Sequence, residues 1–168
     1  GSKAENKGNF GGSEGSLWKA FIVFDVAAYV DELVQNPKGT LKIQVSWIKD
    51  PAAVREATVD YIGAFPAIAM DDTSFWPKYS DPGKSLGVIP VTELATLQQA
   101  KTFDFSIDGA IPSGDVSPVN RYLYFRVSAP MPENSEANGM CSLSAVPAEH
   151  TLTLGSGGDS STGGGGYL

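Results

Sequence analysis

Adjacent carboxylates at Asp71 and Asp72, followed by Thr73 and Ser74, are the first residues of the sequence whose types suit chemistry. Oxygen ligands of this kind bind calcium, and a pair of carboxyl groups can act as acid and base. A calcium site needs oxygens that converge from several parts of a fold, whereas adjacent residues of a turn or strand point in different directions. We therefore interpret this segment as a solvated loop.

His150 and Cys141 are the single histidine and the single cysteine of the chain. One cysteine excludes an intrachain disulfide framework, and a zinc cluster of cysteines is excluded as well. A hydrolase could run through His150, but no Gly-x-Ser-x-Gly turn is present to expose a serine nucleophile. We interpret His150 as a histidine at a strand edge without a catalytic role, and Cys141 as a buried side chain. We expect no enzymatic activity, no metal and no cofactor.

Aromatic side chains gather between residues 71 and 82, where Phe75, Trp76 and Tyr79 lie close to Lys78 and two prolines. Aromatic residues on loops are common in protein interfaces and in platforms that stack against sugars. The other interpretation is that Trp76 folds back and covers the end of the domain. The residues that we single out as a possible interface or ligand loop are Asp71, Asp72, Phe75, Trp76 and Tyr79.

The composition indicates an acidic chain that folds. Its 168 residues include 12 Lys and Arg against 19 Asp and Glu, for a formal net charge of -7. This charge repels phosphates, so direct binding of nucleic acid is not expected. The hydrophobic fraction of 42% supports a packed core, and no apolar run is long enough for a transmembrane helix. We therefore expect a soluble protein without a membrane partner.

Alternation of apolar and polar residues dominates the middle of the chain, which is typical of strands with one face buried. The segment 40–48 predicts a strand with Leu41, Ile43, Val45 and Trp47 on its buried face. Two further segments show the same period. Buried faces are predicted there for Phe103, Phe105 and Ile107 in the segment 102–108, and for Leu123, Phe125 and Val127 in the segment 121–129.

These segments and their neighbours predict an all-β, antiparallel sandwich of about eight strands. The segment 17–26 is apolar on both faces and fits a central strand. Helical spacing of apolar residues is seen at 27–35 alone, which predicts one short helix. Most of the 19 glycines lie near the ends of the chain. We therefore expect a flexible leader at 1–16, a β-sandwich domain at 17–154 and a flexible tail at 155–168.

Three stretches resemble the coat proteins of picorna-like viruses, particularly the plant comovirus and nepovirus group. They are Gly39 to Val45, Thr102 to Asp108 with the Ile111-Pro112-Ser113-Gly114 loop, and Arg121 to Val127 running into Ala129-Pro130. In that family a Gly-Thr-Ile type strand follows a short helix, a Phe-Ser-Phe type strand precedes a Gly/Pro/Ser loop, and a Tyr-rich strand ends in a Pro turn. The family usually has two strands before the helix. Here the leader hides the first strand, or another polypeptide supplies it.

The resemblance implies a viral jelly roll that acts as a capsid subunit in the virion. Its partners would be copies of itself or sister capsid subunits in an icosahedral shell, with a host receptor or glycan as a further possible partner. The Gly-Ser start fits release by a viral protease, and it equally fits a cloning remnant. The alternative function is a carbohydrate- or receptor-binding β-sandwich module with Trp76, Phe75 and Tyr79 as its stacking surface.

Overall fold

The fold is given by a computed structural model of the chain. It describes residues 8–13, 15–68, 75–134, 136–155, 161–163 and 165–167. For 75–77, 147, 161–163 and 165–167 it describes the backbone and not the side chains.

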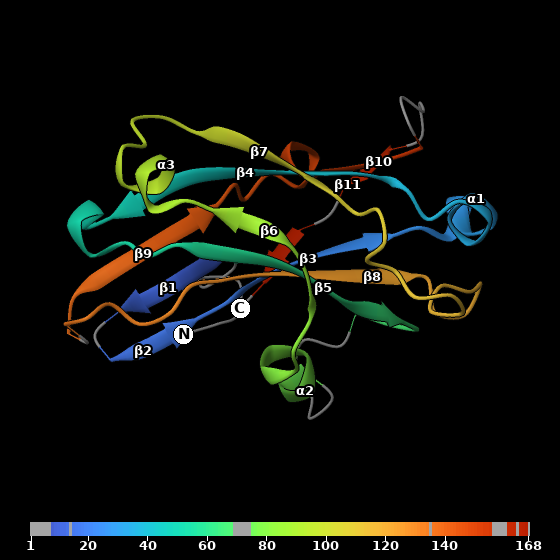
Figure 1. Ribbon diagram of the computed structural model, residues 1–168, viewed down its shortest axis with the longest axis horizontal. Helices are drawn as coiled ribbons and strands as arrows, with labels where there is room; N and C mark the ends of the chain where they lie inside the picture. The colour runs from blue at the N-terminus through green and yellow to red at the C-terminus, as the bar shows by residue number, and fades with distance from the viewer. Residues whose placement is uncertain are drawn as a thin grey trace.

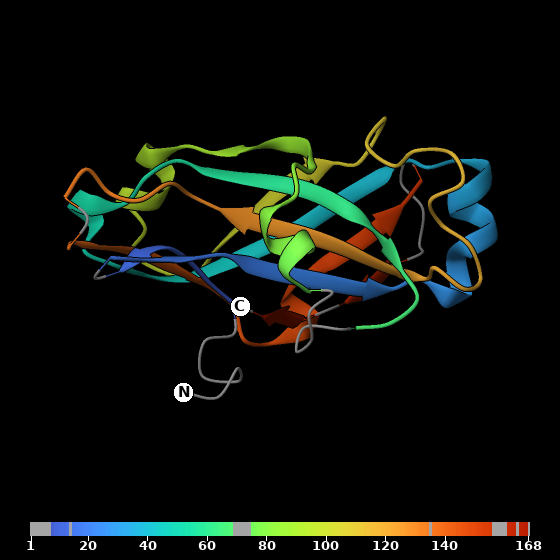
Figure 2. The same ribbon diagram turned by 90° about the horizontal axis from the view of Figure 1, so that it is seen from below.

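Within these residues, two antiparallel sheets of seven and five strands pack as a sandwich (Figures 1 and 2). The seven-stranded sheet runs in the order β11-β10-β4-β9-β1-β2, and β7 pairs with β4 as well. The strands of this sheet are β1 (Asn9–Ser13), β2 (Ser16–Trp18), β4 (Gly39–Lys49), β7 (Lys101–Ser106), β9 (Asn138–Leu143), β10 (Thr151–Leu154) and β11 (Ser161–Gly163).

The five-stranded sheet runs in the order β12-β3-β8-β5-β6. The central strand predicted between residues 17 and 26 is present in it as β3, after a break at Lys19 that separates β3 from β2. The strands of this sheet are β3 (Ala20–Asp25), β5 (Ala57–Phe65), β6 (Lys84–Ile89), β8 (Tyr122–Ser128) and β12 (Gly165–Tyr167).

Eight strands of the described chain pair in a nested way. Taken in chain order as β1, β3, β4, β5, β6, β7, β8 and β9, the first pairs with the eighth and the second with the seventh. The third pairs with the sixth, and the fourth with the fifth. Every one of these pairs is antiparallel. The chain therefore folds back on itself, and the reversal lies between β5 and β6.

Short helices lie at the ends and along one side of the sandwich. The predicted helix at 27–35 is confirmed as a 3-10 turn followed by one α-helix, and it lies at one end beside the loop that follows β7 (Figures 1 and 2). At the other end lies α3, whereas α2 is apart from both ends (Figure 1). The helices are η1 (Ala27–Tyr29), α1 (Val30–Gln35), η2 (Pro51–Ala53), α2 (Phe75–Ser80), α3 (Val91–Ala95) and η3 (Pro147–Glu149).

The main core fills the space between the two sheets, and the predicted faces of β7 and β8 supply part of it. Phe105 and Ile107 are buried there, and so are Leu123, Phe125 and Val127. The opposite face of β8 was expected in water. Instead, Tyr124 joins Phe21 and Val23 in a second buried cluster, because α2 and Ala67, which precedes it in the chain, contact that face of the sheet.

Trp47 is a correction to the predicted face of β4. Leu41, Ile43 and Val45 are fully buried as expected, but Trp47 exposes 48% of its surface. The register against β9 shifts between Val45 and Trp47, which is the mark of a β-bulge. Because one extra residue moves every later side chain to the other face, Ile48 packs against the core in place of Trp47.

The first strand of the sandwich lies inside the segment that we expected to be a flexible leader. β1 pairs along its whole length with β9, and Phe10 is buried in the core. Close packing, and not flexibility, requires glycine in this strand, since a Cβ on Gly11 would lie 2.2 Å from the carbonyl oxygen of Gly139. Within the expected tail, β11 pairs with β10 and β12 pairs with β3.

Candidate functional site

The aromatic segment singled out from the sequence is described only in part. Asp71 and Asp72 lie outside the described residues, and Phe75 and Trp76 open α2 with side chains that are not described. Tyr79 is half-buried on the outer face of the five-stranded sheet. Its hydroxyl donates a hydrogen bond to the Leu17 carbonyl at 2.6 Å, and its ring lies under the Lys19 ammonium at 4.5 Å. Both contacts tie α2 to the residues of β2 and of the break that precedes β3.

Arg126 of β8 is the centre of this attachment. Its Nη1 donates to the carbonyl oxygens of Lys78, Tyr79 and Asp81 at 3.2, 3.2 and 2.6 Å, and its Nη2 donates to Asp60 Oδ2 at 2.9 Å. The last carbonyls of a helix have no partner within the helix and carry the negative end of its dipole, so a cation there stabilises the helix end. The guanidinium therefore fixes the end of α2 to a buried carboxylate of β5.

Lys78 of α2 is buried against aromatic rings of the sheet below. Its Nζ lies 4.4 Å from the centre of the Phe65 ring and 5.5 Å from that of Tyr124. An ammonium over a ring face is attracted by the negative charge of that face, and more strongly where water is excluded. The Tyr124 hydroxyl donates to the Ala67 carbonyl at 2.9 Å. These groups make a structural attachment, which the alternation of β8 alone did not reveal.

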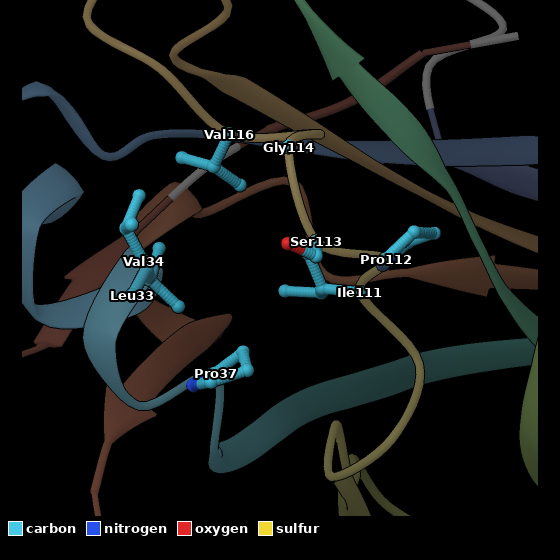
Figure 3. A pocket seen from close by; sticks show the side chains of 8 residues that line it. All are labelled: Leu33, Val34, Pro37, Ile111, Pro112, Ser113, Gly114 and Val116. Atoms are coloured by element: carbon cyan, nitrogen blue, oxygen red, sulfur yellow. The ribbon is translucent and has the colours of Figure 1, made fainter.

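A cleft of about 310 Å³ lies at the α1 end of the sandwich (Figure 3). Leu33 and Val34 of α1 form one wall, and Ile111 and Pro112 of the loop after β7 form the other. Among the described residues that line it, Ser113 alone has a polar side chain, and none is charged. The full lining is Leu33, Val34, Pro37, Ile111, Pro112, Ser113, Gly114 and Val116. Such a cleft suits an apolar group and offers no charge to an ionic ligand.

The loop wall of this cleft is held in place by Asp115. The Tyr61 hydroxyl of β5 donates to Asp115 Oδ2 at 2.6 Å. Burial and this hydrogen bond raise the pKa of Tyr61 well above its ordinary value, so the phenol stays protonated as the donor. The sequence marked Ile111 to Gly114 as a turn, but the cleft depends on α1 and this loop meeting in space.

His150 lies directly before β10, at the end of a strand as expected, and its side chain is fully buried. The Gln44 N–H donates to Nδ1 at 3.3 Å, and Nε2 lies 2.8 Å from the Ser144 carbonyl oxygen. The ring proton of the neutral histidine is therefore on Nε2, which donates to Ser144. Burial lowers the pKa of His150, although the Ser144 bond and the charge of Glu149 oppose this. Neither contact involves a serine hydroxyl, as a hydrolytic site would need.

Cys141 is buried in the core, as expected from its apolar neighbours. Burial raises the pKa of its thiol to about 12, so the reactive thiolate is disfavoured at neutral pH. In the described part of the chain, no three His, Cys, Asp or Glu side chains gather as metal ligands would. Among the same residues, no helix has the length and apolar character to cross a membrane.

Comparison with protein-family models gives no match to this chain, and neither does comparison with curated proteins or with solved structures.

Proposed function

We propose that the chain is a capsid subunit with a jelly-roll fold, which assembles with copies of itself or with sister subunits into an icosahedral shell. The nested strand pairing carries this proposal. A jelly roll has eight strands in two sheets, wound so that the first pairs with the eighth and the fourth with the fifth. The pairs β1·β9, β3·β8, β4·β7 and β5·β6 fit that pattern.

The position of β1 supports the proposal further. The coat proteins that the sequence resembles usually have two strands before the short helix, and β1 supplies the one that the sequence pattern lacked. The three stretches that carry the resemblance fall on β4, β7 and β8, in the order that this winding requires. The net charge of -7 favours a place in the shell and leaves contact with the genome to another subunit or domain.

The α1 end of the sandwich is the surface that we expect a neighbouring subunit to cover. Val34 exposes 60% of its surface beside the apolar cleft, and Val119, in the loop that runs from this end into β8, exposes 68%. Burial of such surface between subunits stabilises an assembly by roughly 25 cal/mol for each Å². In a shell, every subunit would bury this apolar surface against a neighbour.

Val34→Asp is expected to prevent assembly without unfolding the subunit. A carboxylate at the rim of the cleft would have to be desolvated in the assembled state, but it stays in water in the free subunit. Sedimentation velocity of the protein from producing cells should show at least a tenfold loss of assembled material (about 1.4 kcal/mol). Val34→Leu is the matched control, since it keeps the rim apolar and should assemble as the unsubstituted chain does.

Two results separate the parts of this proposal. If the unsubstituted protein and both variants all sediment at 17.7 kDa, the capsid function is contradicted. If all three assemble equally, the shell stands and the α1 end is not one of its contacts.

A further inference from the structure

Two different strands pair along one edge of β4 and leave a gap between them, and the His150 side chain lies in this gap. β7 pairs with β4 over residues 40–45, so β10 and β9 must share the other edge of β4. On that edge, the pairing of β4 with β10 ends at Lys42, and its pairing with β9 begins at Val45. Gln44 lies in the gap. Its N–H donates to His150 Nδ1, and its carbonyl accepts from the Ser144 N–H at 2.9 Å.

The imidazole therefore takes the place of a missing strand carbonyl. Nδ1 accepts the bond that a backbone oxygen would accept in an unbroken ladder, and Nε2–H closes the loop by donating to Ser144. This arrangement requires a neutral ring. A proton on Nδ1 would turn the acceptor into a donor that faces the Gln44 N–H, and the charge would have no water around it because the ring is fully buried.

We propose that His150 is an acid-sensitive pin, which holds the 144–150 segment and the start of β10 against β4 while its ring is neutral and releases them when the ring is protonated. The inference concerns the seven-stranded sheet and does not rest on the capsid function. Its effect is local, because the nested pairs of the sandwich do not use this ring.

The charged groups around the pin are few. Glu149 of η3 is adjacent, and its Oε2 accepts a bond from the Gln44 side chain at 3.3 Å. On β4 the nearest charge along the strand is Lys42, which lies opposite Asp104 of β7. The residues of β9, β10 and β11 are all uncharged. Glu149 raises the folded pKa of His150 toward its ordinary value, so this carboxylate weakens the response of the pin to acid and does not cause it.

The pH dependence follows from linkage. Burial holds the folded pKa of His150 below the ordinary value of 6.5, and an opened ring regains that value. The pin therefore holds fully above about pH 6.5 and loses stability as the pH falls, because the open state binds the proton first. If the closed ring stays neutral, the equilibrium constant for opening increases by up to about thirtyfold as the pH falls from about 7.5 to about 5.

Amide hydrogen exchange by NMR tests this directly. The protection factor of the Gln44 amide, corrected for intrinsic exchange, should fall between about pH 7.5 and about pH 5, by at most about thirtyfold. The Phe125 amide in the other sheet should keep its protection. His150→Gln keeps a donor and an acceptor but cannot titrate, so it should lose this pH response, whereas Glu149→Gln should retain it.

The inference is overturned if Gln44 and Phe125 lose protection together, if His150→Gln responds as the unsubstituted protein does, or if Glu149→Gln loses the response. The nitrogen shifts of the His150 ring give a test that needs no variant. At neutral pH they should show a protonated Nε2 and a bare Nδ1, and a proton on Nδ1 would overturn the inference.

Discussion

Arg126→Met is expected to lower the free energy of unfolding by about 3 to 5 kcal/mol. The substitution leaves the Asp60 carboxylate buried without its cation, and it removes the donor to three carbonyls at the end of α2. Loss of one partner of a buried ion pair costs far more than the pair itself contributes, since the remaining charge stays out of water. Urea unfolding followed by circular dichroism measures the change.

The double variant Arg126→Met with Asp60→Leu is the matched control. It removes both charges and fills the space with apolar atoms, so it should recover the part of the loss that the unpaired Asp60 charge causes, and not the part due to the three carbonyls. A single variant that loses less than about 1 kcal/mol would show that Asp60 is solvated and that α2 is not held through this pair.

Phe125→Ala is expected to cost about 3 to 5 kcal/mol through lost burial and the cavity that remains. The ring is fully buried between the sheets. It meets Phe24 edge-to-face at 5.8 Å between centroids, and Tyr61 at 5.6 Å. Phe125→Leu keeps most of the volume and should cost less than about 1.5 kcal/mol. A loss below about 1 kcal/mol for the alanine variant would contradict the burial of Phe125 between the two sheets.

The buried faces of the long strands could be predicted from the sequence because the period of a strand is independent of its partners. Leu41, Ile43 and Val45 alternate with polar residues, and this is enough to place them in the core. Trp47 follows the same alternation and is nevertheless exposed. The bulge that moves it arises from the pairing of β4 with β9, which lies far away in the sequence.

Glycine misled the prediction of the leader because one residue type serves two physical purposes. In a linker it gives flexibility, whereas Gly11 and Gly12 let other chain segments approach closely. A Cβ on Gly12 would lie 2.4 Å from Cδ of Pro132. Only the neighbouring strand and loop distinguish the two purposes, and neither is visible in the local sequence.

The covered outer face of β8 and the setting of His150 depend on distant contacts in the same way. Tyr124 and Arg126 have the polar groups expected of a wet face, but the Ala67 carbonyl is the partner of Tyr124, and α2 and the Asp60 carboxylate are the partners of Arg126. His150 has an ordinary local sequence. Its role in the sheet arises from the gap between β9 and β10, which places Gln44 opposite the ring.

The mass of the native particle tests the central claim most directly. Protein recovered from its natural source should be examined by light scattering and by particle imaging. The capsid function predicts a closed shell of megadalton order that contains this chain, since a complete shell unites many subunits by symmetry. A monomer of 17.7 kDa in that material would contradict it, and would favour the carbohydrate- or receptor-binding module instead.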